Sequence, residues 1–225
     1  DTPIGSLIWS ESPVTEIGVA DLPVPDLESL ESALGGLDGK RILVRCDFNV
    51  PVRDGAISDD LRIKAALPTL HWLSERGATI AACTHFGRPH GVPDPKFSVQ
   101  ILRERINELA PGVELLENLR FNQGETENSA EFVRYLVDGA DGQPFDGYVN
   151  DAFGASHRSH ASIVGPPVSL PSAAGRLLLK EVDVLERLRS SPERPFVAVL
   201  GGAKVSDKLA VIEALLNVVD RLLIG

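Results

Sequence analysis

The sequence has no methionine, only two cysteines, and no run of about 18 apolar residues in its 225 positions. The missing apolar run argues against a membrane-spanning helix, and no basic start precedes an apolar segment as it does in a signal peptide. Cys46 and Cys83 match no metal-binding or redox spacing, so we expect buried, reduced thiols in a cytoplasmic protein. Because translation starts at methionine, we expect a processed chain or a part of a longer one.

Basic side chains are missing from residues 1–38, which hold eight of the 32 acidic residues. The remaining 24 acidic residues face 22 basic ones, so most of the net charge of −10 belongs to the N-terminal region. The rest of the chain is nearly neutral, which argues against a nucleic-acid partner. Prolines at four positions argue against regular structure in residues 1–26, and we predict an acidic, proline-rich extension there.

The body of the chain alternates apolar, β-branched runs with segments of helical periodicity. The runs predict strands over residues 41–47, 79–84, 113–117, 147–151, 196–200 and 220–224. The periodicity predicts helices that start at Ser58 and end at Gly77, and others over 98–109, 130–137, 176–189 and 206–217. We expect Ser58 to cap the first helix and Pro68 to kink it, with loops over residues 48–57, 85–96 and 123–128 and a further one around 165–171. Such alternation predicts a Rossmann-like α/β fold with a parallel sheet.

The segment SSPERP at residues 190–195 is typical of a linker. We therefore predict one α/β domain over residues 27–175 and an interdomain helix with its linker over 176–195. Residues 196–225 are then the beginning of a second α/β domain.

Each predicted strand of the first domain is followed by polar side chains that suit an anion. Four arginines stand in these loops or in the helix that follows: Arg62, Arg88, Arg120 and Arg158. Other polar residues at the same places are Asp47, Asn49, His85 and His157. Ligands of open parallel sheets bind beyond the carboxyl ends of the strands, and the planar fork of arginine suits phosphate. A single arginine is usually a solvated surface charge, but four equivalent ones favour a pocket for a small ligand with more than one anionic group.

The histidines give weaker signals. His157 and His160 are close in sequence, but without a third ligand nearby they do not favour a metal site. His71 and His90 follow no pattern, and we expect no special role for them.

The segment LGGAKVSDK at residues 200–208 places two glycines between a strand and a helix. Glycines there let backbone N–H groups approach a phosphate, and Lys204 and Lys208 add positive charge about one helical turn apart. The Walker pattern is absent. A phosphate-binding loop and a merely structural turn both remain open from these residues.

Six segments together resemble phosphoglycerate kinases: VRCDFNVP (44–51), RIKAALP (62–68), HFGRP (85–89), LLENLRF (115–121), VNDAFGASHRSHAS (149–162) and VAVLGGAKVSDK (197–208). The resemblance implies an N-terminal domain for 3-phosphoglycerate or 1,3-bisphosphoglycerate and a C-terminal domain for Mg-ADP or Mg-ATP. It implies a monomer that acts on small molecules, with Mg²⁺ carried by the nucleotide. The implied substrate-binding residues are Asp47, Asn49, Arg62, His85, Arg88, Arg120 and Arg158. The implied nucleotide-binding residues are Gly202, Ala203, Lys204 and Lys208, and Arg62 and Lys208 are the implied catalytic pair.

The sequence departs from this family in three places. Residues 1–26 have no counterpart, residues 98–116 are shorter by about one strand and one helix, and the chain stops early in the nucleotide domain. Two other functions therefore remain open: a non-catalytic phosphoglycerate-binding module, and a scaffold whose acidic arm recruits a partner.

Overall fold

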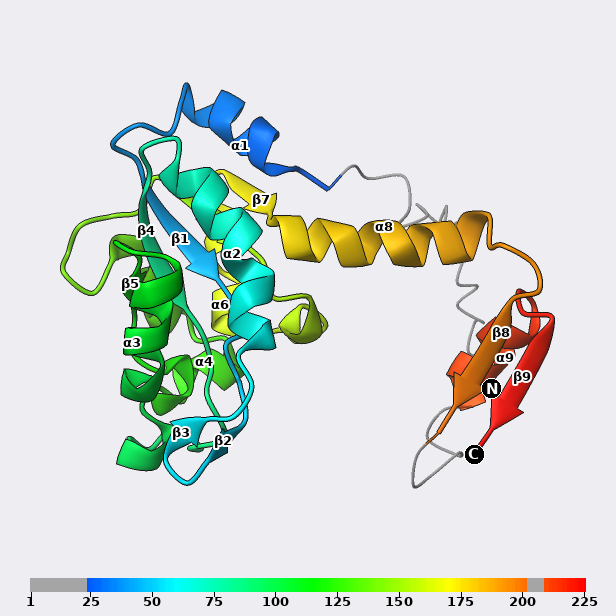
Figure 1. Cartoon of the computed structure of the whole chain (residues 1–225). Helices are drawn as coiled ribbons and strands as arrows, with labels where there is room; N and C mark the ends of the chain where they lie inside the picture. The colour runs from blue at the N-terminus through cyan, green and yellow to red at the C-terminus, as the bar shows by residue number, and fades with distance from the viewer. Residues whose placement is uncertain (1–23, 202–208) are drawn as a thin grey trace, which may run out of the picture.

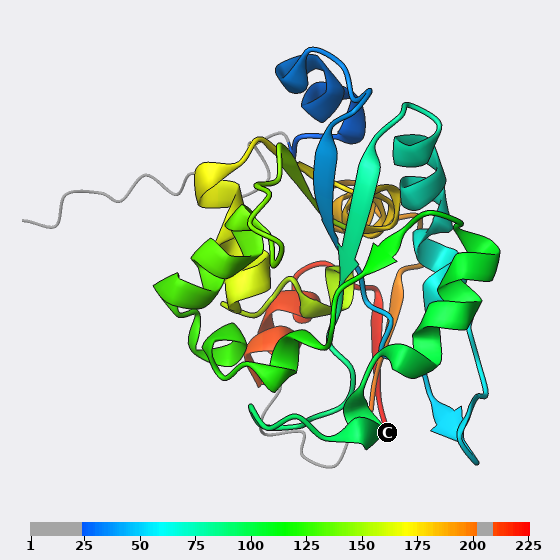
Figure 2. The same cartoon turned by 90° about the vertical axis from the view of Figure 1, so that its left-hand side faces the viewer.

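The computed structural model describes residues 24–201 and 209–225, and its main body is a five-stranded parallel sheet with helices on both faces (Figures 1 and 2). The strand order is β5-β4-β1-β6-β7, and each neighbouring pair is parallel. The strands are β1 (Arg41–Arg45), β4 (Thr79–Cys83), β5 (Glu114–Leu115), β6 (Gly147–Asn150) and β7 (Ser172–Ala174). The predicted parallel α/β fold is confirmed.

The central strand β1 is buried on both sides, as its unbroken apolar sequence predicts. Ile42 and Val44 pack against the first layer of helices: α1 (Leu27–Leu34), α2 (Leu61–Ser74) and α3 (Gln100–Leu109). Leu43 points to the opposite face, where Phe132 and Leu136 of α5 (Ala130–Asp138) cover it. Because successive side chains of a strand alternate, one strand supplies both cores.

Shorter elements fill the connections between these layers. They are the helices α4 (Gly124–Glu127), α6 (Ala161–Val164) and α7 (Pro166–Ser169), and the 3-10 turns η2 (Pro95–Phe97), η3 (Leu119–Phe121) and η4 (Phe153–Ala155). A second, parallel sheet joins β8 (Val197–Leu200) to β9 (Arg221–Ile224), with α9 (Leu209–Leu216) between them. Helix α8 (Arg176–Ser190) leads from the five-stranded sheet to this pair (Figure 1). Within the described ranges, every helix is too short or too polar to cross a membrane.

Several predicted details differ from the structure. Helix α2 begins at Leu61, three residues after the predicted cap: the Ser58 hydroxyl donates to the Pro51 carbonyl (3.1 Å), and Asp59 Oδ1 accepts from the N–H of Leu61 (2.8 Å). Pro68 lies inside α2, which continues to Ser74, so the expected kink stays a prediction.

The predicted loop at 48–57 contains a hairpin of β2 (Val52–Arg53) and β3 (Ala56–Ile57). Its turn residues Asp54 and Gly55 both have positive φ, which is the usual geometry for an Asp-Gly hairpin turn. Helix α7 lies within the loop that was expected around 165–171, and α6 and β7, which the sequence did not predict, lie on either side of it. The alanine-rich sequence of β7 has none of the β-branched residues that mark a strand.

A buried carboxylate attaches α8 to the sheet. Asp151 follows β6 and is fully buried, and its Oδ1 accepts hydrogen bonds from the backbone N–H groups of Leu177 (2.9 Å) and Leu178 (3.2 Å). Burial raises the pKa of Asp151, whereas the hydrogen bonds that it accepts favour its charged form. A Cβ at Gly175 would lie 2.2 Å from the same oxygen, so the backbone must be glycine for this close approach. Asp151 thus fixes the first turn of α8 beside the end of β6.

We expect Asp151→Ala to lower the free energy of unfolding by about 3 kcal/mol, because the N–H groups of Leu177 and Leu178, of which the second is buried, lose their acceptor. Urea denaturation followed by circular dichroism measures the change. The matched control is Asp59→Ala, since the exposed Asp59 carboxylate accepts one N–H at the start of α2 (2.8 Å). Equal losses in the two variants would contradict the structural role of Asp151.

Candidate anion-binding site

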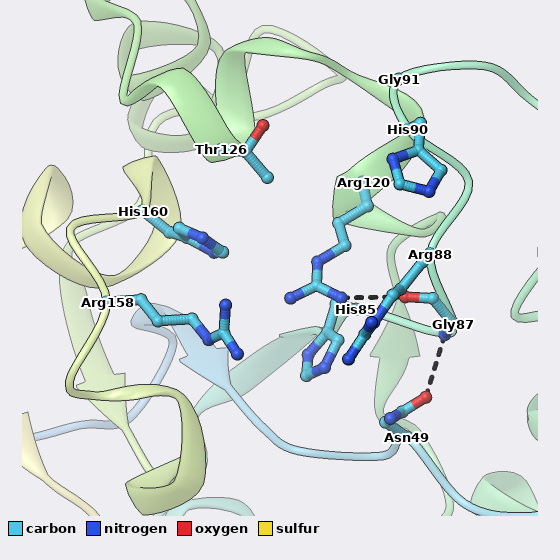
Figure 3. A pocket seen from close by; sticks show the side chains of 10 residues that line it. All are labelled: Asn49, His85, Gly87, Arg88, His90, Gly91, Arg120, Thr126, Arg158 and His160. Atoms are coloured by element: carbon cyan, nitrogen blue, oxygen red, sulfur yellow. Dashed lines mark hydrogen bonds between the residues drawn. The ribbon is translucent and has the colours of Figure 1, made fainter. Parts of the chain in front are cut away.

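A cavity of about 390 Å³ lies beyond the carboxyl ends of the strands (Figure 3). Four segments line it, and they follow β1, β4, β5 and β6. The lining residues are Asn49, His85, Gly87, Arg88, His90, Gly91, Arg120, Thr126, Arg158 and His160. Most of the polar residues predicted from the strand ends therefore meet in one place.

Three arginines, Arg88, Arg120 and Arg158, extend into the cavity from separate segments (Figure 3). Within the described part of the chain, none of them forms an ion pair with a carboxylate. The pKa of Arg120 is lowered, first by burial and then by the charges of Arg158 and Arg45. Such crowding of like charges favours an anion, which would relieve the repulsion and accept the guanidinium hydrogen bonds.

Two asparagines hold the loops of the cavity in place. Asn118, which is buried, accepts from the N–H groups of Phe86 and Arg120 (both 3.1 Å) and donates to the Phe86 carbonyl (2.7 Å). Asn49 accepts from the N–H of Gly87 (2.9 Å), whose carbonyl in turn accepts from Arg120 Nη1 (2.9 Å). Asn49 therefore braces the loop that carries Arg88 and, through it, the side chain of Arg120.

His85 forms the floor of the cavity as a neutral imidazole. Burial lowers its pKa to about 3, helped by the charges of Arg45 and Arg120 and opposed by Asp47. Its Nδ1 lies 3.1 Å from Nη2 of Arg45, which has only hydrogens to offer, so Nδ1 accepts and Nε2 carries the ring proton. The positive charge that faces a ligand thus comes from the arginines.

Arg62 does not line this cavity, unlike the other three predicted arginines. It forms an ion pair with Asp47 (2.7 Å) and lines a neighbouring hollow of about 180 Å³ beside α8. The reason is the packing of α2 against α8, which turns the first residues of α2 toward the α8 side of the loop at 47–49. Asp47 faces this hollow and Asn49 faces the cavity, so the same loop joins the two sites.

The structure also adds residues that the sequence did not reveal. Arg45, at the end of β1, is 1% exposed and contacts His85. His90, expected to be ordinary, lines the cavity with a positive φ of 55°. His160 and Thr126 line it too, whereas His157 is exposed and does not. The only sequence feature that could have indicated a role for Arg45 is its charge within an apolar strand. No sequence pattern indicates that His90 and Thr126 line the cavity.

The predicted nucleotide-binding residues Gly202, Ala203, Lys204 and Lys208 lie outside the described residues. Their role, including that of Lys208 as a catalytic residue, stays a prediction.

Comparisons with known proteins agree on one family. The family model described as phosphoglycerate kinase matches residues 33–114 and 100–225. The chain is 50% identical over 212 residues to the phosphoglycerate kinase of Rubrobacter xylanophilus, covering 84% of this chain and 53% of that protein. It is 50% identical over 217 residues to that of Salinispora arenicola, covering 83% and 53%.

Solved structures give the same result. The phosphoglycerate kinase of Coxiella burnetii superposes with a TM-score of 0.78 at 34% identity, covering 90% of this chain and 55% of that one. The enzyme of Pyrococcus horikoshii superposes with a TM-score of 0.69 at 35% identity, covering 84% and 53%. The chain thus spans about half the length of the relatives that it matches, and it belongs to the phosphoglycerate kinase family.

Proposed function

We propose that this protein is a phosphoglycerate kinase, which transfers a phosphoryl group reversibly between 1,3-bisphosphoglycerate and ADP to give 3-phosphoglycerate and ATP, a step of glycolysis. The observation that carries the proposal is the convergence of Arg88, Arg120 and Arg158 in one cavity at the strand ends. Several guanidinium groups without carboxylate partners suit a small acid that carries both a phosphate and a carboxylate.

The proposed substrate site has two parts. In the cavity, Arg88, Arg120 and Arg158 bind the anionic groups of phosphoglycerate, while His85 and Asn49 shape the floor and hold the loops. In the neighbouring hollow, Asp47 holds Arg62 at the edge that faces α8. Arg62 therefore lies outside the cluster of Arg88, Arg120 and Arg158 and can contact the phosphoryl group during transfer.

Transfer between an acyl phosphate and ADP needs no covalent intermediate. It needs the donor and acceptor oxygens in line and compensation of the charge on the moving group. We assign this compensation to Arg62 from the first domain and Lys208 from the second. The substrate Mg-ADP or Mg-ATP would bind through Gly202, Ala203, Lys204 and Lys208, with Mg²⁺ carried by the nucleotide.

An acyl phosphate hydrolyses readily, so the reaction must exclude water. The proposed division of the chain meets this need: residues 27–175 bind phosphoglycerate, residues 196–225 begin the nucleotide domain, and residues 176–195 act as the hinge. Asp151 fixes one end of that hinge. The extension over 1–26 has no role in this scheme. We further propose a cytoplasmic monomer without nucleic-acid or membrane partners, in keeping with the buried free thiols of Cys46 and Cys83.

The non-catalytic alternatives have less support, because the family match continues through β8 and β9 to residue 225. The test is an assay of the full-length protein for ATP formation from 1,3-bisphosphoglycerate and ADP. Absence of ATP formation would refute the proposed activity. Calorimetry with 3-phosphoglycerate on the same protein would then separate the two alternatives. A binding module would give a heat of binding, and a scaffold would give none.

The two parts of the site predict different kinetic effects. We expect Arg62→Ala to lower kcat about 100-fold with little change in KM, because the charge of Arg62 acts on the transferred group.

We expect Arg158→Ala to raise the KM for 3-phosphoglycerate about 10-fold or more, because Arg158 binds the substrate before the transfer begins. Steady-state kinetics measure both, with the exposed Arg53→Ala on β2 as the control. Similar changes of kcat and KM in the two variants would refute these roles.

The neutral state of His85 predicts an effect of pH on stability. Between pH 6.5 and about 3, the unfolded chain takes up a proton at His85 that the folded protein excludes, so stability falls as the pH falls through this window. We expect the wild type to lose about 2 kcal/mol more than His85→Asn between pH 7 and pH 5. Urea denaturation at the two pH values measures the difference, and His160, present in both proteins, cancels. Equal acid losses would show that the folded protein protonates His85.

A further inference from the structure

A buried carboxylate, Glu125 of α4, lies behind the cavity and has no part in the proposed reaction. Its exposure is 0%, and one serine holds both of its oxygens. The Ser162 hydroxyl donates to Oε1 (2.7 Å) and the Ser162 N–H donates to Oε2 (2.9 Å). A buried carboxylate is costly unless it is paired and hydrogen-bonded, so the role of Glu125 is found from the side chains that it contacts.

The first cation is Arg45, which Glu125 reaches through Ser162. Arg45 Nε donates to the Ser162 hydroxyl oxygen (3.0 Å), and this hydroxyl uses its own hydrogen for Glu125. The hydrogen bonds therefore run in one direction, from Arg45 to Ser162 to Glu125. Because Arg45 Nη2 also contacts Nδ1 of His85, this chain ends at the floor of the cavity.

The second partner of Glu125 is His160, on the opposite wall of the cavity. Its Nδ1 lies 3.6 Å from Glu125 Oε1, and the residue is 9% exposed. Burial and the charges of Arg120, Arg158 and Arg45 lower the pKa of His160, whereas Glu125 raises it. Glu125 likewise raises the pKa of Arg120 against the effect of Arg158 and Arg45. The carboxylate thus opposes the mutual repulsion of the cavity cations.

We propose that Glu125 is a positioning residue for anion binding: through Ser162 it holds Arg45 under His85, and directly it holds His160, so that floor and wall are in place before the ligand arrives. The identity of the ligand, 3-phosphoglycerate, rests on the proposed function. The placement of His85 and His160 by Glu125 does not depend on the proposed function.

The first test is Glu125→Gln in the full-length protein, which keeps the side-chain shape and removes the charge. We expect the Kd for 3-phosphoglycerate to rise about 10-fold in calorimetry, with kcat within about twofold of wild type. Charge alone would act in the opposite sense, because loss of a negative charge strengthens the attraction of the cavity for an anion. The matched control is Glu127→Gln on the same helix, where the exposed Glu127 accepts from Gln123 Nε2 (2.6 Å) and lines no part of the cavity.

The second test separates positioning from general stability. In NMR titrations of the ligand-free protein, we expect the His160 ring to take up its proton at a lower pH in Glu125→Gln than in wild type, and at an unchanged pH in Glu127→Gln.

We also expect Ser162→Ala, which keeps the carboxylate and breaks the link to Arg45, to weaken binding of 3-phosphoglycerate about 10-fold. In the double variant Glu125→Gln/Ser162→Ala we expect a Kd close to that of the weaker-binding single variant, because both substitutions break the same chain of hydrogen bonds.

Wild-type affinity or tighter binding in Glu125→Gln would overturn the proposal. If Glu125→Gln does not fold, Ser162→Ala replaces it: weakened binding supports the proposal and wild-type affinity overturns it. If the wild type itself does not bind 3-phosphoglycerate, the proposed function fails. The role of Glu125 is then judged by the His160 titration alone: a shifted titration supports it and an unchanged one refutes it.

Discussion

Repulsion among guanidinium groups is the constraint on which the rest of the structure depends. Arg88, Arg120 and Arg158 share one cavity, and Arg45 lies buried directly behind it. Like charges so close together are unfavourable unless an anion or a buried carboxylate compensates them. The protein supplies one such carboxylate, Glu125, and leaves the remaining charge for a ligand. Burial is the main cause of the lowered pKa values of Arg120, His85 and His160, and the charges of the neighbouring arginines lower them further.

The fold makes this arrangement possible. Parallel strands end at one edge of the sheet, so loops distant in sequence deliver their side chains to the same cavity. Asn118 and Asn49 then tie the loops together through backbone hydrogen bonds. The same edge carries Asp151, which anchors α8, so the anion cavity, the Arg62 hollow and the start of the helix that leads to β8 and β9 are built on adjoining residues.

The sequence was sufficient for features that depend on local pattern. Apolar, β-branched runs predicted four of the five strands of the parallel sheet, and position after each strand predicted that Arg88, Arg120 and Arg158 meet. Features that depend on tertiary partners were missed. Arg62 turns away because α2 packs against α8, and the strand β7 lacks β-branched residues. Glu125 and Ser162 are 37 positions apart, and no local pattern relates them.

The central claim is that three arginines act as one site for a small polyanionic acid. NMR measurement of their side-chain Nε–H signals during titration with 3-phosphoglycerate tests it most directly. The account predicts that the signals of Arg88, Arg120 and Arg158 shift together and saturate at a single Kd, while that of the exposed Arg53 does not move. Shifts confined to one of the three, or saturation at different ligand concentrations, would contradict it.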